Sequence, residues 1–204
     1  MRHMIKATLL FTLACFYAAA SLAQEGKPAG IAKRKFKHHG KIDSRYDPST
    51  DKTTVVLNPY AIPPDATDTN VYPQRFSIMC GFTYKGRASS GRPATIEFHL
   101  LSDGSHGWKF DKEPQRALSA TVDGERVEIG GMRLVSAKHY MVPSSPVNYG
   151  REVFLEELYI PLTYEGMLKI ATGKRVLLSV GEQKIQLDDE HLEALRDLTS
   201  RMAP

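Results

Sequence analysis

The segment Asp103–Trp108 holds the densest group of side chains that could do chemistry. Asp103, Ser105, His106 and Trp108 place a carboxylate, a hydroxyl, an imidazole and an indole within six residues. Loops on rigid scaffolds often carry binding sites. These four residues are therefore candidates for the lip of a ligand pocket, with Trp108 as a stacking platform and His106 as a hydrogen-bonding or acid–base group. We favour the structural interpretation, a glycine-rich connection whose tryptophan enters the core, because neighbouring side chains diverge along a turn.

Two other groups of polar residues are weaker candidates for a site. Glu97 and His99 are two residues apart, on one face of an expected strand. A zinc site needs three or four ligands, and we identify no third, so we predict no metal site. Glu152, Glu156 and Glu157 resemble the carboxylate pair of a glycoside hydrolase. We favour a charged strand edge for these three residues.

The short motifs of common enzyme classes are absent from the chain. It contains no Gly-x-Ser-x-Gly, His-Glu-x-x-His, Cys-x-x-Cys, phosphate-cradling glycine loop or dinucleotide fingerprint. We therefore assign no catalytic residue and no cofactor, and we favour a non-catalytic protein. An active site assembled from distant residues stays open, because such a site leaves no local motif.

A strand around Cys80 is predicted by strict alternation. Between Phe76 and Tyr84 the even positions are apolar, and a period of two places those side chains on one face of a strand. Cys80 then points inward with Ile78 and Phe82. A buried cysteine in apolar surroundings is inert, so we expect neither a nucleophile nor a disulfide here.

The pattern from residue 42 onward is that of strands separated by turns. A Pro/Ser/Asp cluster at 47–51 predicts a reversal between two strands, and four prolines within 59–73 predict a loop. Ile96, Phe98 and Leu100 form a second inward face. In the first half of the domain we expect strands at 44–46, 53–57, 76–84 and 96–100, with a further strand beginning at Trp108 and Phe110.

The most specific local signal is the dipeptide Asp123-Gly124 between two β-patterned runs. Asp-Gly favours a two-residue type I′ hairpin turn. That turn sets the register and opposes Ala120 to Val127 and Leu118 to Ile129, with all four side chains on one face. Further strands are expected at 132–140 and 152–162.

The C-terminal part changes in character. We expect a short helix over 164–171 closed by Gly173, then a hairpin of 176–180 and 184–187. Asp188 or Asp189 can cap a final helix by accepting hydrogen bonds from its free amides. That helix has one apolar stripe, formed by Leu192, Leu195, Leu198 and Met202.

These elements together predict a mainly β fold, an antiparallel β-sandwich or open barrel with a short helix and a C-terminal amphipathic helix. We divide the chain into a signal peptide (1–23), a disordered basic arm (24–41) and a single β-rich domain (42–204).

The first 23 residues have the pattern of an export signal. Arg2 and Lys6 precede an uncharged apolar run, and Ser21-Leu22-Ala23 provides small residues before a cleavage site at Gln24. The run is too short for a membrane span, and no later segment is longer. We expect a periplasmic or extracellular protein. The alternative is a lipoprotein anchored at Cys15, after Leu13-Ala14.

Charge is distributed unevenly along the chain. Residues 24–41 hold six Lys or Arg against one acid, whereas 42–204 hold 19 basic and 22 acidic residues. The acidic balance of the domain argues against nucleic-acid binding. The arm is either a solvated spacer or a tether to an anionic envelope surface. For the tether we single out Lys33, Arg34, Lys35 and Lys37.

The arrangement resembles uncharacterised exported β-rich proteins of bacteria. The opening Ser44-Arg45-Tyr46-Asp47 with Thr53-Thr54-Val55 carries this resemblance, together with an ending spread over residues 168–196. That ending is Leu168-Lys169-Ile170-Ala171, Val176, Val180-Gly181, Leu187, Leu192 and Leu195-Arg196. The resemblance implies a fold and a compartment, and it implies no activity.

We therefore expect an exported, non-catalytic β-sandwich with a binding or structural role in the cell envelope or outside the cell. Two alternatives remain, a hydrolase of an envelope polymer and an adaptor for a partner protein.

Overall fold

The computed structural model describes residues 35–64, 73–87, 91–105, 107–144 and 148–202. The predicted signal peptide, Cys15 and the first part of the predicted basic arm lie outside the described residues. All statements below refer to the described part of the chain.

Six antiparallel strands form the larger sheet, in the order β1-β2-β3-β4-β8-β7. Their bounds are β1 Ile42–Asp47, β2 Lys52–Ile62, β3 Arg75–Lys85, β4 Ile96–Gly104, β7 Arg133–Ser144 and β8 Asn148–Leu162. The predicted turn at 47–51 joins β1 to β2. It is closed by the Asp47 carboxylate, which accepts hydrogen bonds from Ser49 N and from the hydroxyls of Ser49 and Thr50.

Four antiparallel strands form the smaller sheet, in the order β10-β9-β5-β6. Its strands are β5 Ala117–Val122, β6 Glu125–Gly131, β9 Val176–Val180 and β10 Gln183–Leu187. The helices are η1 Glu113–Arg116, a 3-10 turn, α2 Tyr164–Thr172 and α3 Asp189–Ser200.

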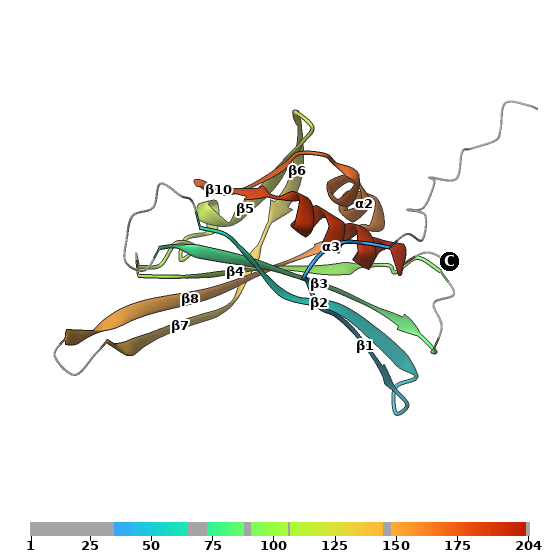
Figure 1. Ribbon diagram of the computed structural model, residues 1–204, viewed down its shortest axis with the longest axis horizontal. Coiled ribbons are helices and arrows are strands. Elements are labelled where there is room, and N and C mark those ends of the chain that lie inside the picture. Colours follow the sequence, from blue (N-terminus) through green and yellow to red (C-terminus); the bar gives the residue numbers. More distant parts are fainter. Residues whose placement is uncertain (1–34, 65–72, 88–90, 106, 145–147, 203–204) are drawn as a thin grey trace, which may run out of the picture. The chain divides into compact units, whose positions relative to one another are not determined.

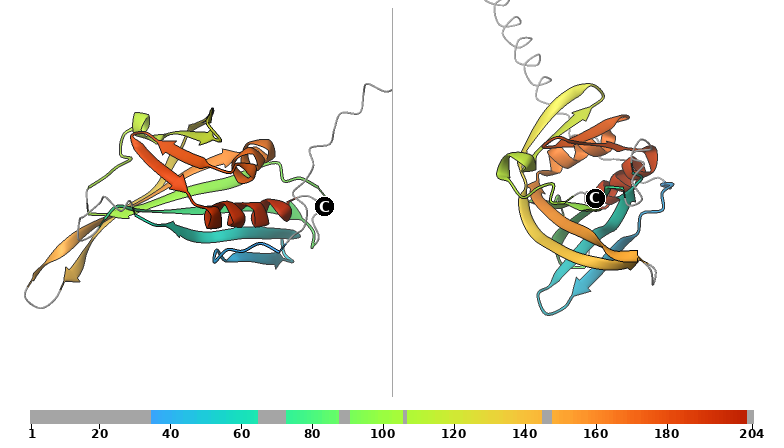
Figure 2. Two further views of the ribbon diagram at one scale, coloured as in Figure 1. Left: turned by 45° about the horizontal axis from the view of Figure 1, so that its top comes forward. Right: turned by 90° about the vertical axis from the view of Figure 1, so that its left-hand side faces the viewer.

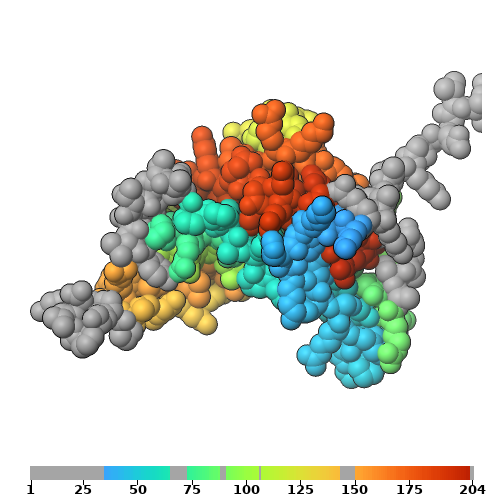
Figure 3. All heavy atoms as spheres, in the orientation of Figure 1, coloured from blue at the N-terminus to red at the C-terminus, as the bar shows by residue number. Residues whose placement is uncertain are grey.

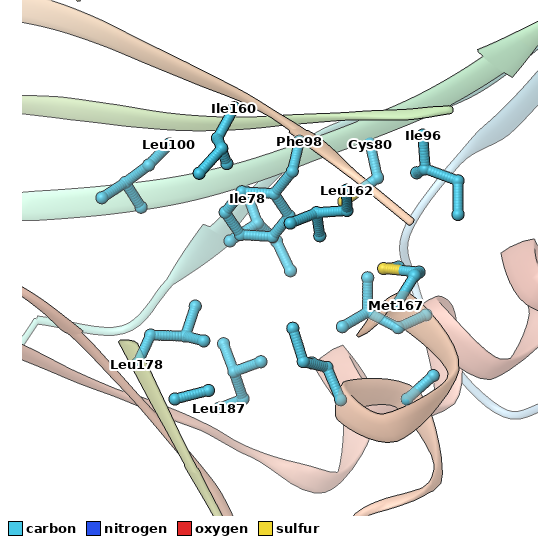
Figure 4. Packing of buried hydrophobic residues seen from close by; sticks show 14 of the residues in the cluster. Ile78, Cys80, Ile96, Phe98, Leu100, Ile160, Leu162, Met167, Leu178 and Leu187 are labelled. Carbon is cyan, nitrogen blue, oxygen red and sulfur yellow. The ribbon is translucent and has the colours of Figure 1, made fainter. Parts of the chain in front are cut away.

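The smaller sheet and the two α-helices cover one face of the larger sheet (Figure 1), and α3 runs along β2 (Figure 2). The core lies between these layers. Figure 4 shows the larger sheet contributing residues such as Phe98 and Cys80, opposite Leu178 and Leu187 of the smaller sheet and Met167 of α2. The prediction of a mainly β, two-sheet antiparallel fold with two helices is confirmed, and the sheets do not close into a barrel.

The alternating apolar residues of β3 bury one face of the strand, as predicted. Ile78 and Cys80 are fully buried and Phe82 nearly so. Burial raises the pKa of the Cys80 thiol well above its usual range, so the reactive thiolate is suppressed.

The Asp123-Gly124 hairpin is confirmed, with one correction to its register. Both turn residues have positive φ, as a type I′ turn requires, and Ala120 pairs with Val127. Leu118, however, pairs with Gly130 and not with Ile129, because a β-bulge between Leu118 and Ser119 inserts one extra residue into β6. Turn chemistry fixes the register near the turn, and a bulge resets it further away.

Two predicted boundaries were wrong. The expected loop at 59–73 begins later, since β2 continues to Ile62 and accommodates Pro59 in a bulge where its missing N–H is tolerated. Most of the rest of that loop lies outside the described residues. The strand expected from Trp108 is absent, and residues 107–112 are irregular and lead into η1.

Helix ends follow the predicted chemistry. Asp188 is the N-cap of α3, and its carboxylate accepts a hydrogen bond from His191 N at 2.9 Å. Thr163 caps α2 by accepting from Gly166 N, and Gly173 follows the last turn of that helix. The predicted stripe of α3 is confirmed, because Leu192, Leu195, Leu198 and Met202 are all fully buried.

Residues 35–41 have no regular secondary structure, yet they lie against α3 (Figure 3). His38 Nε2 is 3.1 Å from Asp197 Oδ2, and His39 Nδ1 is 2.8 Å from Glu190 Oε2. Asn58 N of β2 donates to Lys41 O. The predicted disordered arm therefore does not include residues 35–41. Local composition did not reveal this contact, because the carboxylates that hold the segment come from the far end of the chain.

Candidate binding surface

The β7–β8 hairpin projects beyond the other strands of the larger sheet (Figure 1). Along the inner face of β8, Leu158 and Ile160 belong to the core beneath the smaller sheet. Glu156 follows, then Phe154, and towards the end of the hairpin Glu152 is exposed. The inner face of β8 thus passes from the closed core to a surface open to solvent.

Glu156 attaches a loop to this strand. Its side chain is buried, and its carboxylate accepts hydrogen bonds from Lys109 N at 2.8 Å and Phe110 N at 2.9 Å. Hydrogen bonds from backbone amides to a carboxylate are charge-assisted and short. The predicted charged strand edge was wrong for Glu156, because β8 is an interior strand between β4 and β7. The side chain of Phe110 enters the core directly after this attachment.

This attachment positions Trp108, which immediately precedes Lys109. The indole packs edge-on against Phe154, with ring centroids 4.9 Å apart and an interplanar angle of 79°. From β7, His139 stacks on the same phenyl ring at 4.7 Å and 21°. We call Trp108, Phe154 and His139 the aromatic cluster. Trp108 is 38% exposed, so the cluster presents an aromatic surface to solvent.

The other large apolar side chains that are exposed among the described residues are Val135, Tyr140 and Met141, all on β7. β7 is also an end strand of its sheet. Three features of β7 discourage pairing with a further strand. They are a register shift near Val135, the exposed charge of Lys138, and Pro143, which has no backbone N–H. The exposed side chains of this hairpin, and not its backbone edge, are therefore the surface available to a partner.

His139 of the aromatic cluster also has a charged neighbour. His139 Nε2 lies 3.8 Å from Glu152 Oε1, and both side chains are largely exposed. A cavity of about 170 Å³ lies elsewhere, between β6 and α2, and is lined mainly by apolar residues including Val127, Ile129 and Ile170. The cluster itself is an open surface on a hairpin.

The residues predicted as a pocket lip separate onto different faces. Asp103 lies on the outer face of β4, where it forms an ion pair with Arg75 at 3.0 Å. Its neighbour Gly104 lies opposite Phe154 on the inner face, the side on which Trp108 packs. Ser105 is exposed, and His106 lies outside the described residues. Of the four candidates, only Trp108 is joined to the aromatic cluster by a described contact.

The predicted anionic-surface contacts are only partly described. Lys33 and Arg34 lie outside the described residues. Lys35 and Lys37 line a shallow hollow together with acidic residues of α3, namely Asp189, Glu190 and Glu193. Part of the basic charge of this segment therefore faces carboxylates of the same chain.

Glu97 and His99 do not meet in a metal site. The His99 Nδ1 atom is 2.8 Å from Glu157 Oε1, and the imidazole packs edge-on against Tyr159. Glu97 lies in the next cross-strand row, opposite Gly81 and Pro161. The described residues contain no group of three or more His, Cys, Asp or Glu that could hold a metal ion.

Sequence reasoning missed Phe154, His139 and the role of Glu156. A signal was present, since Phe154, Glu156, Leu158 and Ile160 alternate with the same phase. A glutamate within an inward-facing series indicates a buried carboxylate that needs donors. The residues that supply those donors, 46 and 47 positions earlier in the chain, could not be identified from spacing.

Comparison of the chain with protein-family models, with curated proteins and with solved structures gave no match. Within the described residues, no helix has both the length and the apolar character needed to cross a membrane. The candidate surface must therefore be interpreted from its own chemistry.

Proposed function

We propose that this is an exported protein with a non-catalytic binding role in the cell envelope or outside the cell, and that the aromatic cluster of the β7–β8 hairpin is its binding surface. The observation that carries the proposal is Trp108, a 38% exposed indole that a buried carboxylate fixes in place through the next two residues. Tryptophan side chains are highly buried on average, so an indole held 38% exposed offers an apolar contact surface to a partner.

The physical argument is one of preorganisation. Trp and Tyr offer a large, rigid and amphipathic contact area at a small cost in conformational entropy, and aromatic anchors dominate binding surfaces. The Glu156 hydrogen bonds fix the loop before a partner arrives, which lowers the entropic cost of association. The open shape of the cluster suits a large partner better than an enclosed small molecule.

Export is supported by the sequence of residues 1–23, with its basic start, apolar run and small-residue exit. Cell fractionation of a C-terminally tagged protein tests it. We expect the protein outside the cytoplasm with a mature N-terminus at Gln24. A lipidated N-terminus at Cys15 would support the lipoprotein alternative. A full-length chain in the cytoplasm would contradict export.

The binding surface is tested by comparing what co-purifies with the wild-type protein and with Trp108→Ala. We expect Trp108→Ala to lose the specific partner by at least ten-fold, because truncating a central aromatic anchor commonly costs about 2 kcal/mol or more. Tyr46→Ala is the matched control, since Tyr46 belongs to β1, whose hairpin extends away from the β7–β8 hairpin (Figure 1). Equal recovery with Trp108→Ala and wild type would contradict the proposal.

A further inference from the structure

The cavity between β6 and α2 has mainly apolar walls. Among its lining residues, Val122, Leu162 and Ile170 are buried. Val127 and Ile129, which line it from β6, are half-buried. The volume of the cavity is about 170 Å³. An apolar cavity of about 150 Å³ in a protein interior can bind benzene, so this one has room for a single ring or a short branched chain.

Gly166 of α2 contributes to this space because it has no side chain. A Cβ atom at this position would lie 3.3 Å from Thr163 Oγ1. Apart from its chain neighbours and the backbone of its own helix, it would meet no other described atom within 4 Å. The helix therefore lines the cavity with backbone here, and a larger residue would occupy the space.

A cation stands at the edge of the cavity. Lys169 of α2 lines it, and its Nζ donates to Glu125 Oε1 of β6 at 2.8 Å. Both side chains are largely exposed, so this ion pair contributes little to stability and can be exchanged. An ammonium group has three N–H donors, and the described contacts of Lys169 engage one of them. The ammonium can therefore donate to an anion that enters the cavity.

We propose that this cavity binds a small monocarboxylate whose apolar part is one ring or a short branched chain. The apolar part lies among Val127, Ile129 and Ile170, and the carboxylate accepts from Lys169 Nζ in competition with Glu125. This is a second binding site, beyond the proposed function and independent of it, since the aromatic cluster does not line the cavity.

Size and charge together favour this class of ligand over others. A cationic ligand would be repelled by Lys169, and the acid that lines the cavity, Glu128, is already paired with Arg126. A neutral ligand would leave the free donors of Lys169 unused. A strand of a partner protein would have to pair with β6, where the exposed charges of Glu125, Arg126 and Glu128 discourage pairing.

The experiment titrates the chain from Gln24 with phenylacetate and follows the methyl groups of Val, Leu and Ile by NMR. We expect saturable binding with a dissociation constant of about 1 mM or lower, and the largest shifts at Val127, Ile129 and Ile170. Acetate, which lacks the ring, should not bind. The uncharged 2-phenylethanol should bind about five-fold more weakly than phenylacetate.

Three variants separate the roles of charge and space. Lys169→Gln should weaken phenylacetate binding by about three- to five-fold, whereas Glu125→Gln should strengthen it by a similar factor because it removes the competing carboxylate. Lys52→Gln is the matched control, since Lys52 is exposed on β2 and does not line the cavity. Gly166→Leu should fill the cavity and weaken binding at least ten-fold. If thermal unfolding shows that Gly166→Leu is misfolded, Val127→Phe provides the second test of filling.

Each contrary result overturns the proposal. Absence of saturable shifts excludes the ligand, and the largest shifts at methyl groups elsewhere would place it at another site. Equal binding of phenylacetate and 2-phenylethanol would indicate an apolar cavity that does not recognise a carboxylate. Weaker binding by Glu125→Gln would mean that the ion pair only holds α2 to β6. Wild-type affinity in a folded, cavity-filling variant would show that the ligand lies outside the cavity.

Discussion

At the scale of single residues, Glu156 connects the core to the candidate surface. Its carboxylate is buried and accepts from two backbone amides, so the loop that carries Trp108 is fixed to β8. The amides in turn depend on the carboxylate, because a buried N–H without an acceptor is costly. The indole then stays over Phe154 without entering the core.

Substituting Glu156→Gln should lower the free energy of unfolding by about 1–3 kcal/mol. The glutamine side chain has only one oxygen that can accept a hydrogen bond, and its NH₂ group would face a backbone N–H that needs an acceptor. Urea denaturation followed by the fluorescence of Trp108 measures this change, and the native emission should also shift to longer wavelength. Glu97→Gln, at an exposed position of β4, is the control. An unchanged emission spectrum in Glu156→Gln would show that the carboxylate does not position the indole.

At the scale of elements, the segment 35–41 is held by packing as well as by ion pairs. Tyr60 of β2 donates a hydrogen bond to Glu190, the same carboxylate that meets His39. Burial, together with this hydrogen bond, raises the pKa of Tyr60 to about 12. Gly40 lies where the segment crosses between β2 and α3. A Cβ atom at Gly40 would stand 3.0 Å from Leu57 Cδ1 and 3.3 Å from Ala194 Cβ.

Gly40→Ala should therefore destabilise the protein by about 1–2 kcal/mol, because the added methyl group overpacks a tight contact between the segment, β2 and α3. Thermal or urea unfolding checks this value. Gly91→Ala is the matched control, since a Cβ there meets nothing within 4 Å and its stability should change by less than about 0.5 kcal/mol. Equal stability of both variants would mean that the segment moves aside at no cost.

At the scale of the whole molecule, several ionisable groups join the first described residues to the last helix. The hydrogen bond and the charge of Glu190 raise the pKa of His39 above 6.5. Hydrogen bonds from His39 and Tyr60 lower the pKa of Glu190. Burial alone would raise the pKa of Asp197, but hydrogen bonds from Arg201 and His38 outweigh it and the pKa is lowered.

These directions predict a stability maximum in mildly acidic solution. The contribution of His39 is complete below its unfolded pKa of 6.5 and is lost as the pH rises through the higher folded value. The contributions of Glu190 and Asp197 are complete above their unfolded pKa values of 4.5 and 3.8 and are lost as the pH falls through the lower folded values.

A series of urea denaturations across this pH range, with His39→Gln beside the wild type, measures the effect. The difference in the free energy of unfolding between the two proteins should shrink as the pH rises through the folded pKa of His39. Since His39 and Glu190 are exposed, the difference should also be reduced by salt. A difference that does not vary with pH would contradict an ionic role for this pair.

Much of the architecture was predictable because its signals are local. Alternation predicted β3 and β4, Asp123-Gly124 predicted a hairpin, and Asp188 predicted the start of α3. Errors arose where distant residues compete with local preference. The bulges near Pro59 and Ile129 depend on the neighbouring strand, and the position of residues 35–41 depends on α3.

For the candidate surface, the sequence by itself determined that a glycine-rich stretch precedes Trp108, whereas the strand expected from Trp108 was wrong. The alternation of Phe154 and Glu156 also indicates one shared strand face, because it is a property of a short spacing. Only the tertiary structure decided that the buried carboxylate of Glu156 accepts from the amides of Lys109 and Phe110. It also decided that His139 and Trp108 both pack against Phe154. Asp103, finally, lies on the opposite face of the sheet. Such contacts join strands and loops far apart in the chain. Their pairing is fixed by the burial of a core shared between two sheets, a property that no short stretch of sequence contains.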